Sequence, residues 1–262
     1  MSITKIEWAD RVWNPVVGCQ KVGKGCKHCY AEQLHTQRHK AYLRGKLQNI
    51  PQYKFPFEKL QYLTERLYEP YKWKKPCMVF VNSMGDLFMH LMDREYLYEI
   101  LEVIGKTKHT YIILTKRAVN MMLMLNLYYT EKRMKPLKNL WIGISVSTQR
   151  DFEMSIGFLE NTKAAVKLLS IEPILENIEL YNYSSFNWII AGCETGKRRR
   201  KAKLGWFFNL AEQCKKEGIP LFIKQMEVEG AVETEIEKFP QFLKIKQFCH
   251  KNPLGLGGGE KD

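Results

Sequence analysis

The chain has 262 residues, 45% of them hydrophobic, which fits one large α/β domain or two small ones. It contains neither an apolar run of membrane-spanning length nor the apolar core of a signal peptide, so we expect a cytoplasmic protein without a membrane partner. The formal net charge of +13 favours a polyanionic partner, with a nucleic acid or a nucleotide first.

Short β-rich apolar runs alternate with helical patterns along the chain. The predicted strands cover residues 12–17, 78–82, 111–114, 140–146, 166–171, 188–191 and 220–223. Helices are predicted at about 30–42, after Asp93 as the N-cap, around 152–159, and from about 207 to an end near Gly218. Repeated strand–helix units predict a parallel sheet, either doubly wound or curled into a barrel.

One region breaks this alternation. Four prolines and many aromatic residues fall between the first predicted helix and the second predicted strand, so we expect an irregular insertion at about 43–76. Residues 1–250 are predicted to form a single α/β domain. Residues 251–262 are rich in glycine and are predicted to form a flexible C-terminal tail.

Every predicted strand ends in polar or charged residues. Those with the greatest chemical capacity are Asp86, Lys116, Glu172, Glu194 and Lys224. The carboxyl ends of parallel strands meet at one edge of a sheet or barrel, and active sites lie there. The sequence therefore predicts one shared site at this edge.

Three cysteines, Cys19, Cys26 and Cys29, lie between the first predicted strand and the first predicted helix, in the pattern Cys-x6-Cys-x2-Cys. Three thiolates leave one coordination position open, which favours an iron–sulfur cluster with one iron free to bind a substrate. Zinc is the alternative, with a histidine as fourth ligand. His28 lies inside the tight Cys-x2-Cys turn, and His35 is expected on a helix surface, so both are poor candidates.

The chain resembles the three-cysteine-motif, radical-SAM-like proteins, which were first noted in phage genomes and are largely of unknown function. The resemblance covers about residues 4–226. It rests on the cysteine motif together with Asn82-Ser83-Met84-Gly85-Asp86, Leu114-Thr115-Lys116-Arg117, Ser170-Ile171-Glu172-Pro173, Gly192-Cys193-Glu194 and Phe222-Ile223-Lys224-Gln225. Two features depart from the usual radical-SAM pattern: the first cysteine gap is longer than Cys-x3-Cys, and His28 stands where an aromatic residue is usual.

The resemblance implies a partial (β/α) barrel of six to seven mostly parallel strands. It also implies a four-iron, four-sulfur cluster on Cys19, Cys26 and Cys29, with S-adenosylmethionine bound to the fourth iron. Transfer of one electron from an external donor would release methionine and a 5′-deoxyadenosyl radical, which abstracts hydrogen from the substrate. The sequence leaves open whether a partner protein is required.

Candidate binding residues follow from their chemistry. Side chains that could hold the methionyl, ribose or amino groups of S-adenosylmethionine, or its carboxylate, are Asn82, Ser83, Asp86, Lys116, Ser145, Glu172, Glu194 and Lys224. A basic run at 197–203 follows the sixth strand-end motif and would border the same edge. The residues expected to meet substrate phosphates in this basic rim are Arg117, Arg198, Arg199 and Arg200.

The leading interpretation is an iron–sulfur, S-adenosylmethionine-dependent radical enzyme that modifies or repairs a nucleic acid or a nucleotide. One alternative is a zinc-stabilised nucleic-acid-binding protein without catalysis. Another is a radical enzyme that acts on a peptide or a small molecule. The sequence does not identify the substrate atom attacked, and it does not show whether S-adenosylmethionine is consumed or recycled.

Overall fold

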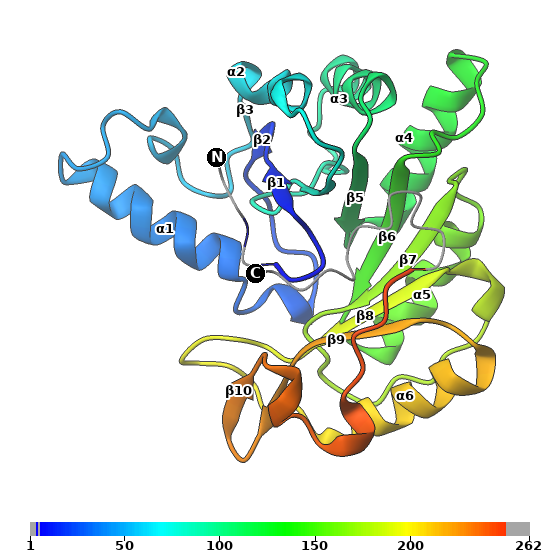
Figure 1. The fold of residues 1–262 in the computed structure, drawn as a ribbon. Coiled ribbons are helices and arrows are strands. Elements are labelled where there is room, and N and C mark those ends of the chain that lie inside the picture. The colour runs from blue at the N-terminus through cyan, green and yellow to red at the C-terminus, as the bar shows by residue number, and fades with distance from the viewer. Residues whose placement is uncertain (1–3, 5, 250–262) are drawn as a thin grey trace.

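A computed structural model describes residue 4 and residues 6–249 of the chain, so the predicted tail lies outside the described residues (Figure 1). An eight-stranded sheet forms its centre, in the order β1-β4-β5-β6-β7-β8-β9-β10. Neighbouring strands are parallel except for β9 and β10. The strands are β1 (Arg11–Trp13), β4 (Met78–Val81), β5 (Thr110–Thr115), β6 (Leu140–Val146), β7 (Val166–Ile171), β8 (Trp188–Gly192), β9 (Leu221–Val228) and β10 (Ala231–Glu233). The sheet curls into a half barrel, as predicted, but with eight strands rather than six to seven.

Six helices accompany the described strands: α1 (Tyr30–Leu43), α2 (Thr64–Leu67), α3 (Arg94–Lys106), α4 (Ala118–Glu131), α5 (Gln149–Glu160) and α6 (Leu204–Glu217). Asp93 caps α3 as predicted, because its side chain accepts a hydrogen bond of 2.8 Å from the backbone of Tyr96. Gly218 ends α6 in the left-handed conformation, with φ 66°. None of the described helices combines the length and the apolar character that a bilayer crossing requires.

The insertion at about 43–76 contains only short elements. They are the 3₁₀ helix Pro51–Tyr53, the strand β3 (Gln61–Tyr62), helix α2 and the 3₁₀ helix Glu69–Lys72. β3 pairs antiparallel with β2 (Val16–Val17), outside the main sheet. The predicted strand at 12–17 is therefore two strands, β1 and β2, separated by Asn14 and Pro15.

The two faces of the sheet differ in what covers them. Helices α3 to α6 bury one face, where Leu140, Ile142 and Ile144 of β6 join the larger apolar core (Figure 1). Trp141 of the same strand points to the other, concave face and packs in a second cluster with Trp188 and other residues. Side chains alternate along a strand, so the inner positions that follow Trp141 are Gly143 and Ser145. The concave face is thus apolar at one end and becomes polar toward the carboxyl ends of the strands.

Candidate functional site

The three cysteines line one cavity at the carboxyl edge of the sheet. Cys19, Cys26 and Cys29 are half-buried, and the cavity has a volume of about 260 Å³. Its lining is completed by Gln20, Lys21, Glu32, Phe57 and Glu58. The cysteine loop (residues 18–29) therefore presents three thiols to a common space.

The cysteine loop lies directly against the strand ends, and two glycines permit the close approach. Gly18 has φ +112° and forms a parallel bridge with Gly85, and a side chain there would overlap the carbonyl of Lys59. A side chain at Gly25 would overlap the hydroxyl of Ser147, just after β6. Only glycine fits at positions 18 and 25, because any side chain there would overlap these neighbours.

One end of the cysteine loop is held by Arg117, which follows β5. Its Nη1 atom lies 2.8 Å from an Asp86 carboxylate oxygen and 3.7 Å from the sulfur of Cys19, and its Nη2 atom donates to the carbonyl of Gln20 at 2.7 Å. Asp86 also accepts hydrogen bonds from Thr115 at 2.8 and 2.9 Å. Both predicted residues therefore face each other below the cysteine loop, and Arg117 does not lie on an open rim.

The other end of the cysteine loop is held by Glu194, which follows β8. His28 lies 3.0 Å from its carboxylate through Nδ1, and Arg200 donates to the same group through its backbone and its guanidinium. Arg200 also donates to the carbonyl of Lys24 at 2.9 Å. Burial alone would raise the pKa of Glu194, but the hydrogen bonds from Arg200 and His28 outweigh it, and the pKa is lowered. Glu194 is thus an anchor for the loop.

Between these anchors, four predicted residues of the inner face form one chain of contacts. Lys116 donates to the hydroxyl of Ser145 at 2.5 Å and to the carbonyl of Glu172 at 3.2 Å. Lys224 donates to the Glu172 carboxylate at 3.0 Å. Burial lowers the pKa of Lys116, although attraction by Cys26 and Glu172 opposes this effect. These residues form the polar surface nearest the cysteine loop.

Asn82 and Ser83 directly follow β4. Asn82 is buried with φ 64°, and its Nδ2 atom has no hydrogen-bond partner within the described part of the chain. The carbonyl of Ser83 accepts a hydrogen bond of 2.7 Å from the hydroxyl of Tyr30, the first residue of α1. The sequence motifs did not assign a contact to Tyr30; its position next to Cys29 was the available signal.

Burial favours the protonated thiol at two of the three cysteines, Cys19 and Cys29. It raises the pKa of Cys19 to about 11, and it also raises the pKa of Cys29, where the backbone of Glu32 and Ala31 partly opposes the shift. A metal displaces such protons because only the thiolate is a ligand. The guanidinium of Arg117 and the first turn of α1 are in place to stabilise the resulting negative charge.

A single metal ion and a polynuclear cluster need different spacings between the cysteine sulfurs. Residue 4 and residues 6–249 contain no group of three or more His, Cys, Asp or Glu side chains placed around one metal ion. A tetrahedral zinc ion needs its sulfurs about 3.8 Å apart, given a Zn–S distance of about 2.3 Å. In a polynuclear cluster each thiolate binds its own iron, so the sulfurs lie farther apart. Three thiols around a shared cavity fit that donor set.

Neither candidate histidine lines the cysteine cavity. His28 faces Glu194. The expectation that His35 lies on a helix surface is wrong: it is fully buried between Tyr53 and Phe57, and its Nε2 atom lies 2.9 Å from the carbonyl of Phe55. Residues after the helix fold back over it, which the helical pattern did not reveal.

Two of the three arginines at 198–200 in the basic rim already have partners within the protein. Arg200 is bound to Glu194, and Arg199 lies 3.6 Å from Glu227 and donates to the carbonyl of Gly230. Arg198 has no side-chain partner within the described ranges. Of the four residues predicted to meet phosphate, Arg198 therefore offers the free guanidinium.

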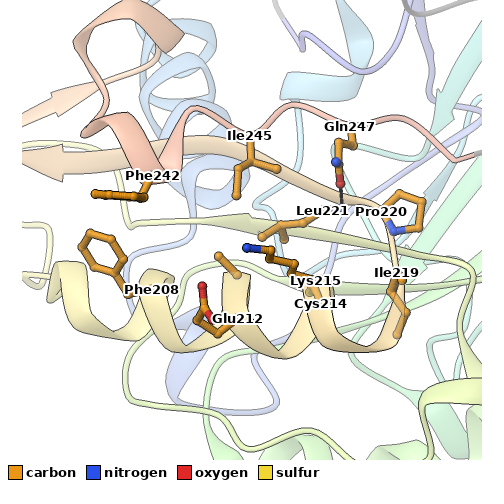
Figure 2. A pocket seen from close by; sticks show the side chains of 12 residues that line it. Phe208, Glu212, Cys214, Lys215, Ile219, Pro220, Leu221, Phe242, Ile245 and Gln247 are labelled. Carbon is orange, nitrogen blue, oxygen red and sulfur yellow. Dashed lines mark hydrogen bonds between the residues drawn. The ribbon is translucent and has the colours of Figure 1, made fainter.

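A larger cavity, of about 690 Å³, lies at the opposite edge of the sheet. Figure 2 shows it between α6 and residues 242–247, with Phe208 and Phe242 facing each other at one end. Gln247 accepts a hydrogen bond of 3.2 Å from the backbone of Leu221, at the amino end of β9. None of the predicted site residues lines this cavity.

Comparison with known proteins identifies a family whose function is unknown. A family model described as "Protein of unknown function (DUF5131)" matches residues 3–243. No curated protein and no solved structure matches the chain. The function must therefore be argued from the site.

Proposed function

Because the chain belongs to the DUF5131 family, whose function is unknown, we propose a function from its site. The protein is an iron–sulfur, S-adenosylmethionine-dependent radical enzyme of the radical-SAM-like type, and it modifies or repairs a nucleic acid or a nucleotide. The observation that carries the proposal is the single cavity lined by Cys19, Cys26 and Cys29 at the carboxyl edge of a half barrel. Active sites of parallel α/β sheets lie at that edge.

The three cysteines would hold a four-iron, four-sulfur cluster, with one iron left for S-adenosylmethionine. When bound, the cluster supplies the electron that cleaves this cofactor to methionine and a radical able to take hydrogen from the substrate. The protein supplies position and charge. Arg117 at Cys19 and the first turn of α1 at Cys29 offset part of the burial that raises the pKa of these thiols.

The inner face provides groups that match the polar end of S-adenosylmethionine. Glu172 and Lys224 pair at 3.0 Å and are both partly exposed, so each can exchange its partner for the amino or the carboxylate group of the cofactor. Lys116 and Ser145 both donate hydrogen bonds to the backbone carbonyl of Glu172, and Lys116 also donates to the hydroxyl of Ser145. These contacts orient Glu172. The Nδ2 atom of Asn82, which has no partner within the described residues, and the hydroxyl of Ser83 would bind ribose hydroxyls.

Asp86 and Glu194 take a different role in this proposal. Their carboxylates already accept several hydrogen bonds from the protein, and both are buried. Removing those partners to bind a cofactor would leave Arg117 or Arg200 unpaired, at a cost of several kcal/mol for a buried charge. They position the cysteine loop and do not bind the cofactor.

Metal analysis of protein purified without oxygen tests the proposal. After reconstitution we expect about four irons and four sulfides per chain and a visible absorption band. Cys26→Ser should lose most of the iron, whereas Cys193→Ser, which removes a buried thiol outside the cavity, should retain it. A colourless protein that binds one zinc and no iron would support the zinc-stabilised alternative instead.

Production of 5′-deoxyadenosine tests the second half of the proposal. Reduced, reconstituted protein should release it from S-adenosylmethionine, and Glu172→Gln should release much less while keeping its iron. A cluster-bearing protein that never forms 5′-deoxyadenosine would leave the iron–sulfur assignment standing and remove the radical one.

A further inference from the structure

The segment from Lys21 to Lys59, here called the basic arm, begins in the cysteine loop at the strand ends and then extends beside the half barrel. Figure 1 shows α1 and the segment that follows it beside the sheet instead of on its helix-covered face. The main element that α1 packs against is the 3₁₀ helix Pro51–Tyr53, within the same arm. An amphipathic helix of the main core would instead bury a broad apolar face, and α1 buries only Ala31 and His35.

More than half of the net charge of the chain is concentrated in the basic arm. Nine Lys and Arg residues stand against two Glu residues there, giving +7 of the total +13. All nine are exposed; they are Lys21, Lys24, Lys27, Arg38, Lys40, Arg44, Lys46, Lys54 and Lys59. Such a concentration makes the arm the strongest candidate for a polyanion-binding surface.

Most of these cations are available to a ligand. Lys21 pairs with Glu32 at 2.8 Å, and Arg38 lies over the ring of Tyr53. Five have no side-chain partner among residues 6–249: Lys24, Lys27, Lys40, Arg44 and Lys46. Of the rim at 198–200, by contrast, Arg199 and Arg200 are paired inside the protein. The arm therefore offers five unpaired cations, whereas this part of the rim offers only Arg198 among the described residues.

The arm contacts the candidate site directly. Within the arm, His35 packs between Tyr53 and Phe57 and so holds α1 against the segment that follows it. Phe57 in turn contacts the cysteine loop, because its carbonyl accepts a hydrogen bond of 2.9 Å from the backbone N–H of Cys19. The 14 residues of α1 extend for about 21 Å, the length of about six phosphates along one nucleic-acid strand. A strand held along α1 would reach the cysteine loop at the helix N-terminus.

The exposed surface of α1 disfavours a membrane as the partner. An interfacial helix needs a continuous apolar face opposite its basic one. The exposed positions along the middle of α1 are Gln33, Gln37, Arg38 and Lys40, and its exposed large hydrophobic side chains, Tyr30 and Leu43, lie at the two ends. Polar and cationic groups without an apolar face suit a solvated phosphate backbone.

We propose that the basic arm is the nucleic-acid-binding element of this protein: its exposed cations, including Lys40, Arg44 and Lys46, hold the phosphate backbone and direct one nucleotide toward the cysteine-bearing edge of the sheet. The second part of this statement rests on the proposed function, while backbone binding by the arm does not. The contacts are to phosphate, so binding depends on salt and little on sequence.

Fluorescence anisotropy with labelled oligonucleotides of about 20 nucleotides, single-stranded and duplex, tests the proposal on the full chain with and without its cluster. The arm variant is Lys40→Gln, Arg44→Gln and Lys46→Gln. The matched control is Lys74→Gln, Lys75→Gln and Lys135→Gln, which removes the same charge from exposed positions before β4 and β6, at the opposite edge. Thermal melting of each variant checks that it is folded.

We expect the arm variant to bind single strands about tenfold more weakly or worse at ~0.1 M salt, and its log–log salt slope to be smaller by about 2. The control should bind as the original chain does. Equal losses in both variants, or none in the arm variant, would overturn the proposal. So would binding to vesicles of anionic phospholipid without binding to oligonucleotides.

The outcome is separable from that of the proposed function. Loss of oligonucleotide binding in the arm variant of a protein that never takes up iron would uphold the arm and reject the radical enzyme. Normal oligonucleotide binding by the arm variant of an iron-containing, 5′-deoxyadenosine-producing protein would reject the arm alone.

Discussion

Arg117 donates a hydrogen bond of 2.8 Å to Asp86 from beneath the cysteine loop, and both side chains are largely buried. The same guanidinium contacts the sulfur of Cys19 and the carbonyl of Gln20. A single buried ion pair therefore connects the ends of β4 and β5 to the first metal-ligand candidate. The pair thus fixes the conformation of the cysteine loop and also contributes to the stability of the folded protein.

Replacing Arg117 by Met should destabilise the protein by about 3–5 kcal/mol, because Asp86 is left buried and unpaired. Chemical denaturation of the metal-free protein measures the change. The double variant Asp86→Asn, Arg117→Met is the control: it should recover part of the loss, because no uncompensated charge remains. Additive losses in the two single variants would show that the pair is not coupled.

Replacing Glu194 by Gln should make the stability of the protein depend less on pH below about 4.5. The pKa of Glu194 is lowered from 4.5 on folding, so the unfolded chain binds its proton first as the pH falls. The ionised group therefore contributes its stability above about pH 4.5 and loses it at lower pH. Melting temperature against pH, compared between Glu194→Gln and the original chain, isolates this contribution. Parallel curves below pH 4.5 would contradict it.

The thiol of Cys19 should be alkylated slowly in the metal-free folded protein. With a pKa of about 11, only about one thiol in a thousand is ionised at pH 8, against about one in ten for the ordinary value of 9.0. Iodoacetamide should therefore modify Cys19 about 100-fold more slowly than in urea-unfolded protein, as followed by peptide mass spectrometry. The rate should rise about tenfold per pH unit up to about pH 11. An equal rate in folded and unfolded protein would contradict the burial of this thiol.

Much of the fold was predictable because the strands are simple. β6 and β7 have the predicted bounds, since each is an uninterrupted β-rich run between turn signals. Helix α4 was missed because it carries apolar residues on its exposed side as well, including Leu123 and Leu127, so no single stripe marks it. The run at 12–17 divides at Pro15, which has no N–H to give to a sheet.

The site was predictable in its members and less so in their pairing. Alternation along β6, β7 and β9 is enough to place Ser145, Glu172 and Lys224 near one another. The partners of Glu194 were not predictable, because His28 is 166 positions away and meets it only through the path of the cysteine loop. Local patterns identify which strand ends carry chemistry, but loop packing decides which groups are already satisfied.

Replacing His35 by Leu should remove a pH dependence from the basic arm. Burial lowers the pKa of His35 from its ordinary value of 6.5, so as the pH falls below 6.5 the unfolded chain binds this proton before the folded chain does. The free energy of unfolding therefore decreases as the pH is lowered below 6.5, and it stops decreasing once the pH is below the pKa of His35 in the folded state. Leucine binds no proton, so the arm of His35→Leu should keep its protection there. Amide hydrogen exchange of residues 30–43, measured from pH 7 to pH 5 and corrected for the intrinsic rate, reports this protection. His90→Gln is the control, because His90 is exposed and should leave the profile unchanged. If His35→Leu loses protection on acidification as the original chain does, another group governs the arm.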